Sequence, residues 1–354
     1  MKDQFNILRA FAIIAVIAIH VTSNFSKIVS YSALPVVVCG VDIFSQFAVP
    51  MFILISGLVL SLRYDGDYSI KTFYKKRINR ILVPYLIWSV IYVTMTFILT
   101  KDISVQRIIY MLFTGSAYYH LWFFFLIFQL YLIFPFYRKL LKGRSFIMII
   151  FTYGLQILFN HYKIGVVGNE QLAMIINRIF LSHIFYFSLG IWIADNIGNV
   201  EIQLSKLNYY LNLMLVIIIT WASYIFTFNW LATNNDFFPI FNALVVLEKA
   251  LLPLVYVLVF IVLYSLAKKI TNAEARKYLE LISRYSFGIY LSHALILYTL
   301  IKLIKQVNIV PNNFSFYFIT FAGTLIASIF FCIVLERTVF SKYLLSIDQK
   351  KKVE

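Results

Sequence analysis

The stretch FNILRAFAIIAVIAIHVTSN, residues 5–24, is the basis for interpreting the rest of the chain. It is almost entirely apolar and is long enough to cross a bilayer as a helix, which needs about 20 residues. Two ionisable side chains interrupt it, Arg9 near its start and His20 near its end. Their spacing corresponds to about three full turns, so both lie on one face, about 16 Å apart along the axis. Ionisable residues inside a span usually face a bundle interior or a wet cavity, so this face predicts a polar path leading inward from one membrane surface.

The composition extends this interpretation to the whole chain. Its 354 residues are 62% hydrophobic and only 13% charged, and long apolar runs recur from end to end. A soluble domain does not have this pattern. We therefore predict an all-α integral membrane protein, a polytopic bundle of about ten transmembrane helices forming one domain over residues 1–340, followed by a short basic tail over 341–354. The spans are expected near residues 5–24, 41–62, 81–100, 120–137, 145–160, 177–194, 209–229, 247–267, 285–304 and 314–335.

The net charge of +16 does not predict nucleic-acid binding, because its distribution follows the predicted loops. Most of the 31 Lys and Arg fall in alternate loops and their flanks, on the side of the N-terminus. Cytoplasmic loops carry such an excess, so we assign both termini to the cytoplasm. Richness in Ile, Phe, Lys and Asn hints at an AT-rich bacterial genome, so the expected location is the inner or plasma membrane of a bacterium.

Asp42 begins the second predicted span and is expected at the same membrane level as His20, because the first two spans are antiparallel neighbours. A carboxylate beside an imidazole fixes its tautomer and raises its basicity, which suits a general base. The alternative is a solvated carboxylate favoured by the dipole at the start of a helix. Further along this span, Pro50 predicts a kink and Ser56-Gly57 a close backbone approach.

Arg77 and Arg80 are three residues apart and therefore share one face of a helix before the third span. Guanidinium groups bind phosphate oxygens bidentately, so this pair, with Arg9 at the same depth, suits a donor that carries several phosphates, such as coenzyme A. The alternative is positive charge that only sets the membrane topology.

Aromatic and imidazole side chains gather at the outer side of the membrane, where a substrate that accepts a transferred group would arrive. Tyr119 and Trp122 flank His120 at the outer start of the fourth span, and they offer flat faces on which sugars stack; the alternative is an interfacial aromatic belt. In the ninth span, Tyr290 and His293 share a face. The remaining polar groups are expected to be structural: His183 in a hydrogen bond to a neighbouring helix, His161 in solvent, and Glu336 in an ion pair with Arg9 or Arg337.

The sequence contains no Gly-rich phosphate loop, no nucleophilic serine elbow and no cluster of metal ligands, so we expect no metal cofactor. A disulfide between Cys39 and Cys332 is not expected, because one lies near a surface and the other inside a late span.

Taken together, these residues form a pattern that resembles a known family, the membrane-bound acyltransferase family 3 proteins, which acylate cell-surface glycans. The matching residues are Arg9-x10-His20, Asp42 with Pro50-Met51-Phe52 and Ser56-Gly57, Arg77-x-x-Arg80, His120-Leu121-Trp122-Phe123 with Tyr131 and Pro135, and Ser286-Phe287-Gly288-Ile289-Tyr290 with His293. The stretch GVDIFSQFAVPMFILISG, residues 40–57, is similar to the branch that acts on enterobacterial common antigen and intercellular adhesin.

The resemblance implies an acyl-coenzyme A donor on the cytoplasmic side, most simply acetyl-CoA, and an acceptor hydroxyl on a surface polysaccharide or lipid-linked oligosaccharide. It also implies that His20 is catalytic and that Arg9, Arg77 and Arg80 lie near the donor. Three points stay open. The acyl group is acetyl or succinyl, and it is transferred either directly or through a covalent acyl-histidine. The protein acts as a monomer or as a homo-oligomer. The competing interpretations are a transporter or flippase of polysaccharide units, whose intramembrane charges line a pathway, and a polysaccharide polymerase, which is disfavoured by the short outer loops.

Overall fold

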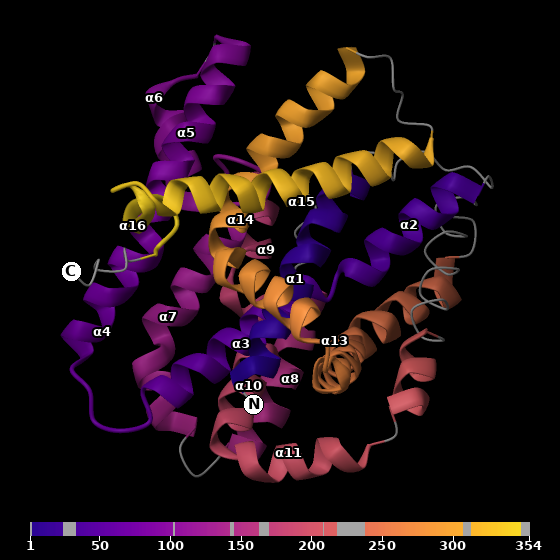
Figure 1. Ribbon diagram of the computed structural model, residues 1–354. Coiled ribbons are helices and arrows are strands. Elements are labelled where there is room, and N and C mark those ends of the chain that lie inside the picture. Colours follow the sequence, from indigo (N-terminus) through magenta and orange to yellow (C-terminus); the bar gives the residue numbers. More distant parts are fainter. Residues whose placement is uncertain are drawn as a thin grey trace.

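The computed structural model describes residues 2–23, 33–101, 103–141, 145–162, 170–207, 209–217, 238–306 and 313–347. All regular elements in these ranges are helices (Figure 1). The longer ones are α1 (Lys2–Ser23), α2 (Ala33–Ser45), α3 (Ala48–Arg63), α5 (Val83–Thr100), α7 (Trp122–Leu141), α8 (Ser145–Tyr162), α10 (Ile184–Asp195), α13 (Phe238–Lys269), α14 (Ala273–Gln306) and α15 (Phe314–Glu336). The shorter ones are α4 (Ile70–Arg77), η1 (Ile78–Leu82), α6 (Val105–Thr114), α9 (Glu170–Asn177), η3 (Phe180–His183), α11 (Ile197–Lys206) and α16 (Ser341–Leu344).

Seven helical stretches among the described residues are long and apolar enough to cross a membrane. They are Asp3–Ser23, Val37–Arg63, Ile70–Thr100, Trp122–Leu141, Ala250–Lys269, Ala273–Gln306 and Phe314–Glu336. The predicted spans near 145–160 and 177–194 correspond to shorter apolar helices, Phe146–Tyr162 and Phe180–Asp195. The predicted span near 209–229 lies largely outside the described residues. The protein is thus an all-helical multi-pass membrane protein.

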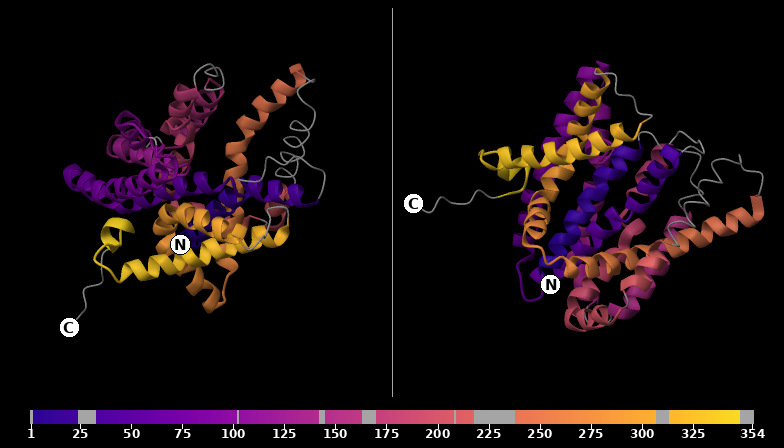
Figure 2. Two further views of the ribbon diagram at one scale, coloured as in Figure 1. Left: turned by 90° about the horizontal axis from the view of Figure 1, so that it is seen from above. Right: turned by 45° about the vertical axis from the view of Figure 1, so that its right-hand side comes forward.

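Helix α1 lies in the middle of the bundle. It packs against α2, α3, α13, α14 and α15. Seen from above, α14 and α15 lie on one side of α1 and the segments α8 to α10 on the other (Figure 2, left). We call the end of the bundle where α1 begins the inner end, because it is predicted to face the cytoplasm, and the opposite end the outer end.

The second predicted span is two helices rather than one. Helix α2 ends at Ser45, Gln46 and Phe47 form a turn, and α3 begins at Ala48. Pro50 explains the break, because proline has no N–H to donate to the carbonyl of Gln46 and its ring crowds that residue. The break turns Asp42 and Gln46 toward the outer end of α1.

A π-helical turn, η1, precedes the third span and carries Arg80. Pro84, at the start of α5, has no N–H for the carbonyl of Arg80, so the regular hydrogen-bond ladder is interrupted there. Single π-turns of this kind are frequent at functional sites. The local sequence therefore sets the orientation of this arginine.

Helices α3 and α10 cross very closely. A Cβ added at Gly57 would lie 2.3 Å from the carbonyl oxygen of Phe187, and one added at Gly190 would lie 2.0 Å from that of Leu54. Both neighbours are backbone atoms, so only glycine fits at these positions. The close approach predicted at Ser56-Gly57 is confirmed, and it is typical of helix packing in membranes.

Candidate active site

A cavity of about 300 Å³ opens at the inner end of the bundle, and we call it the inner cavity. Four guanidinium groups line it, those of Arg9 on α1, Arg77 on α4, Arg80 on η1 and Arg284 on α14. No aspartate or glutamate is among the described residues that line it. The structure therefore brings the three predicted arginines together and adds a fourth, and it makes the cavity strongly cationic.

Arg77 is held among aromatic rings. Its guanidinium carbon lies 5.9, 5.6 and 5.7 Å from the ring centroids of Tyr64, Phe73 and Tyr131. Its Nη2 donates a long hydrogen bond of 3.4 Å to the hydroxyl of Tyr64, and its Nε is buried without a hydrogen-bond partner among the described residues. A buried donor without an acceptor is costly, and phosphate oxygens would satisfy it. The inner cavity is thus suited to a ligand that carries phosphate groups.

Arg284 was not among the predicted site residues. It pairs with Glu336, which also accepts a hydrogen bond from the hydroxyl of Tyr285. The prediction that Glu336 pairs with Arg9 or Arg337 is therefore wrong in this structure, because α14 and α15 pack side by side and bring Arg284 to it. A signal for Arg284 was present in the sequence, since it lies two residues before the motif Ser286-Phe287-Gly288-Ile289-Tyr290.

The chain closes over the inner cavity near its C-terminal end. Leu345, Ser346 and Ile347 line the cavity. Leu345 is 1% exposed, and its side chain packs where a Cβ at Gly288 would stand. Trp88 Nε1 donates to the backbone carbonyl of Leu344 at 3.1 Å. The described part of the segment predicted as a tail is thus packed against the bundle and forms one wall of the site.

Three histidines gather further toward the outer end, and we call them the histidine cluster. The ring of His20 stacks on that of His293, with centroids 5.1 Å apart and planes at 24°. His120 lies 4.9 Å from His293 and 6.4 Å from His20. Tyr119 lies 4.8 Å from His20. Four residues predicted from separate parts of the sequence are therefore neighbours.

Hydrogen bonds hold two of these histidines in place. Tyr290 donates from its hydroxyl to the backbone carbonyl of His120 at 2.6 Å. His293 Nδ1 lies 2.7 Å from the carbonyl oxygen of Tyr290 and 3.1 Å from that of Ile289. Carbonyls only accept, so Nδ1 carries a proton, and Nε2 has no hydrogen-bond partner among the described residues. Within the described ranges, no three His, Cys, Asp or Glu side chains are arranged to hold a metal ion.

Asp42 has other polar contacts. Its Oδ1 accepts from the hydroxyl of Thr22 at 3.0 Å and its Oδ2 from Nε2 of Gln46 at 3.2 Å. Thr22 follows His20 by less than one turn, so Asp42 lies at the membrane level that the sequence predicts. It ties α1 to the broken span α2–α3 near the histidine cluster.

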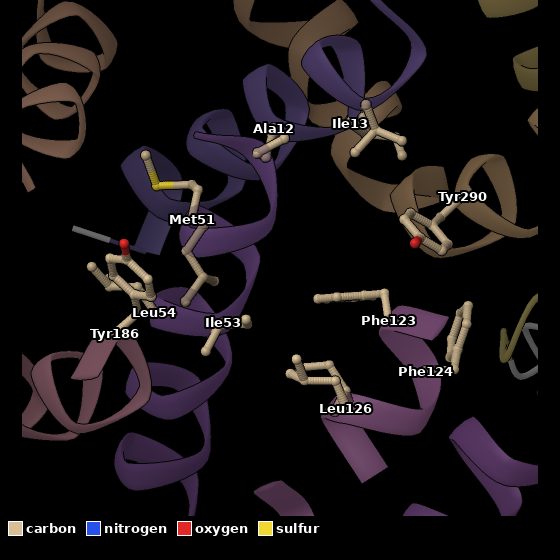
Figure 3. Close-up of a cluster of buried hydrophobic side chains, with 14 of the residues drawn as sticks. Ala12, Ile13, Met51, Ile53, Leu54, Phe123, Phe124, Leu126, Tyr186 and Tyr290 are labelled. Carbon is tan, nitrogen blue, oxygen red and sulfur yellow. The ribbon is translucent and has the colours of Figure 1, made fainter. Parts of the chain in front are cut away.

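A layer of tightly packed side chains separates the inner cavity from the histidine cluster. Ile13 and Val16 occupy the face of α1 between Arg9 and His20 and are 0% and 2% exposed. Phe123 and Tyr290 line the cavity on its outer side, with ring centroids 5.3 Å apart (Figure 3). None of the three histidines lines the cavity. The polar path predicted along α1 is therefore interrupted, because Ile13 and Val16, which lie on the same face between Arg9 and His20, are apolar.

Trp122 is not part of the histidine cluster. Its ring lies 6.2 Å from that of His183, and it borders a second cavity between α3, α8, α10 and α13. The structure thus divides the predicted acceptor residues, with Tyr119, His120, Tyr290 and His293 at one place and Trp122 beside another.

The comparisons with known proteins identify the family. The family model described as an acyltransferase domain, acyltransferase family 3, matches residues 2–333. No curated protein and no solved structure shows a significant match to the chain. The match covers nearly the whole chain and includes the histidine cluster and the described lining of the inner cavity except Leu345, Ser346 and Ile347. The chain belongs to acyltransferase family 3 and is a membrane acyltransferase.

Proposed function

We propose that this protein is an O-acetyltransferase of a bacterial plasma membrane. It transfers the acetyl group of cytoplasmic acetyl-CoA to a hydroxyl of a cell-surface polysaccharide or lipid-linked glycan. The observation that carries the proposal is that α1 and α14 each contribute to both the inner cavity and the histidine cluster, while His120 of the cluster lies two residues before α7, which also lines the cavity. The resemblance of residues 40–57 to the common-antigen and adhesin branch supports a glycan acceptor.

The inner cavity is the proposed donor site. Arg9, Arg77, Arg80 and Arg284 hold the phosphates, as guanidinium groups do in bidentate contacts. The thioester end then points toward the outer end, and the layer of Phe123 and Tyr290 must open for it to reach the histidines. Such openings on the microsecond to millisecond scale are common steps in enzymes.

At the histidine cluster, His20 is the proposed catalytic residue. As a general base it takes the proton from the acceptor hydroxyl, the hydroxyl oxygen attacks the thioester carbonyl, and the carbon–sulfur bond breaks to release coenzyme A, which regains a proton. In the covalent alternative, a nitrogen of His20 attacks the thioester first, and the carbon–sulfur bond breaks to release coenzyme A, which takes up a proton. The acceptor hydroxyl then attacks the acyl-imidazole and gives up its proton, and the carbon–nitrogen bond breaks to free the His20 ring. Asp42 is proposed to assist by fixing the end of α1 that carries His20.

Replacing His20 tests the function. In membranes that contain the full-length protein, acetyl-CoA and an acceptor glycan, we expect His20→Ala to abolish release of free coenzyme A thiol. The control is His161→Ala, since His161 is exposed at the end of α8. Membrane insertion is compared between both variants and the wild type. Wild-type release by His20→Ala contradicts the assigned role, and glycan movement without thiol release identifies a transporter instead.

Radiolabelled acetyl-CoA distinguishes the two chemical routes. Without an acceptor, protein-bound label that is absent in His20→Ala shows the covalent route, and its absence in the wild type shows direct transfer.

A further inference from the structure

A second cavity, of about 280 Å³, lies in the outer half of the bundle. We call it the outer side cavity. It lies between the turn that joins α2 to α3, the start of α7, and helices α8, α10 and α13. No catalytic role at the histidine cluster uses it, and the donor site is at the inner end.

Its lining combines flat rings with polar groups. Trp122, Tyr186 and Tyr256 supply the rings. Carboxamide and hydroxyl groups come from Gln46, Gln156, Asn160 and Ser182, and His183 adds an imidazole. No Asp, Glu, Lys or Arg is among the described residues that line it. Apolar walls with a few polar groups are typical of small-molecule sites.

Two of these polar groups have unused hydrogen-bonding capacity. The Oδ1 of Asn160 and the Oγ of Ser182 have no hydrogen-bond partner among the described residues. The only contact of the Asn160 amide nitrogen there is long, 3.5 Å to the carbonyl of Ser182. Buried polar groups in native proteins are normally paired, so unpaired ones beside a cavity indicate a ligand or water.

The cavity is connected to the histidine cluster in two ways. Gln46 lines it and donates to Asp42, which accepts from Thr22 near His20. Trp122 lines it from the other side, two residues after His120. The cavity is therefore at the membrane level of the histidines and adjacent to them.

We propose that the outer side cavity binds an uncharged sugar residue of the acceptor glycan, next to the sugar that is acylated. The proposal rests on the proposed function and adds a site and a charge class to it. Aromatic faces pack against the C–H face of a sugar ring, while carboxamides and hydroxyls exchange hydrogen bonds with its hydroxyl groups. A lipid chain would leave the amides unpaired, and a uronate or phosphate would find no lysine or arginine among the described lining residues to balance its charge.

The first experiment measures binding without catalysis. Detergent-solubilised full-length protein is titrated with a trisaccharide of N-acetylglucosamine and with one of galacturonic acid, by saturation-transfer NMR. We expect the protein to bind only the neutral trisaccharide. We expect Tyr256→Ala to weaken this binding about fivefold, because the variant loses one aromatic face. Tyr153→Phe is the matched control, because Tyr153 joins α8 to α13 through a hydrogen bond to Ala250 and does not line the cavity. Equal binding of the galacturonate, or unchanged binding in Tyr256→Ala, overturns the proposal.

The second experiment separates this proposal from the proposed function. We expect Tyr256→Ala and Asn160→Asp to raise the KM for the neutral trisaccharide about fivefold, with the KM for acetyl-CoA unchanged. A trisaccharide KM unchanged in both variants, with normal thiol release, rejects the site but leaves the acetyltransferase standing. No thiol release by the wild type rejects the acetyltransferase, and the binding experiment then decides the site alone.

Discussion

Arg77 lies among the rings of Tyr64, Phe73 and Tyr131 at the wall of the inner cavity. This environment suits a planar guanidinium more than an ammonium group, because the guanidinium stacks on rings and presents a rigid fork of donors. The distinction separates a residue that binds a donor from one that only sets the topology, since lysine serves topology equally well.

We therefore expect Arg77→Lys to raise the KM for acetyl-CoA about tenfold, because the charge is kept but the bidentate contact is lost. Steady-state thiol release in isolated membranes measures it. Lys75→Arg is the control, since Lys75 is exposed and does not line the cavity. Wild-type kinetics in Arg77→Lys would show that the residue serves topology only.

Phe124 separates two cavities. It lines the inner cavity and also an apolar cavity of about 390 Å³ between α5, α6 and α7. Its ring is 4% exposed and packs against Phe287 and Tyr290 at 5.4 and 5.3 Å. With the donor site proposed above, we expect a side chain in this position to limit the length of acyl chain that the inner cavity accepts.

Phe124→Ala is expected to join the two cavities and to lower the preference for acetyl-CoA over octanoyl-CoA about tenfold, since each buried methylene is stabilising. Competition between the two donors measures the ratio. The neighbouring Phe125→Ala is the matched control, because Phe125 lines the apolar cavity alone. An unchanged ratio would show that Phe124 does not limit chain length.

At the scale of the element, the two proline-dependent features are readable from the chain. Pro50 breaks the second span, and Pro84 interrupts the helical hydrogen bonds at the π-turn that carries Arg80. Both effects are local, since a proline acts on residues one turn before it. The crossing of α3 and α10 is different, because Gly57 lies against Phe187 and Gly190 lies against Leu54, in each case more than a hundred residues away in the chain.

The crossing of α3 and α10 predicts that a glycine-to-alanine substitution lowers the stability of the protein much more at Gly190 than at Gly198. Gly190→Ala places a Cβ against the backbone of Leu54 and is expected to destabilise the protein by about 1–3 kcal/mol, the usual cost of overpacking. Gly198→Ala is the control, because nothing lies within 4 Å of its added Cβ. Thermal unfolding in detergent gives the comparison, and equal midpoints in the two variants would contradict the observed crossing.

At the scale of the whole molecule, the inner cavity is assembled from both ends of the chain. Arg9 lies in α1, and the lining residues Leu345, Ser346 and Ile347 directly follow α16. The C-terminal segment is held by Trp88 on α5 and by Leu345 against α14. With the donor site proposed above, we therefore expect donor binding to depend on a segment whose sequence has no recognisable motif.

Two truncations test this dependence. Ending the chain after Phe340 removes α16 and the cavity wall, and we expect the KM for acetyl-CoA to rise about tenfold as packing and enclosure are lost. Ending it after Ile347 removes no described lining residue and is expected to leave the KM unchanged. Similar kinetics for the two truncations would show that the wall is dispensable.

The sequence by itself determined the class of protein, the shared face of Arg9 and His20, and the pairing of Arg77 with Arg80. These follow from hydropathy and helical period, which are properties of neighbouring residues. It also identified His120, Tyr290 and His293 as candidates, but not that their rings meet His20.

Only the tertiary structure decided that meeting, the addition of Arg284 and the C-terminal wall to the cavity, and the apolar layer that interrupts the predicted path. It also placed Trp122 beside a separate cavity, and it paired Glu336 with Arg284. The physical reason is that these contacts join helices far apart in the chain, and shape complementarity between whole helix faces selects them, which no local pattern encodes.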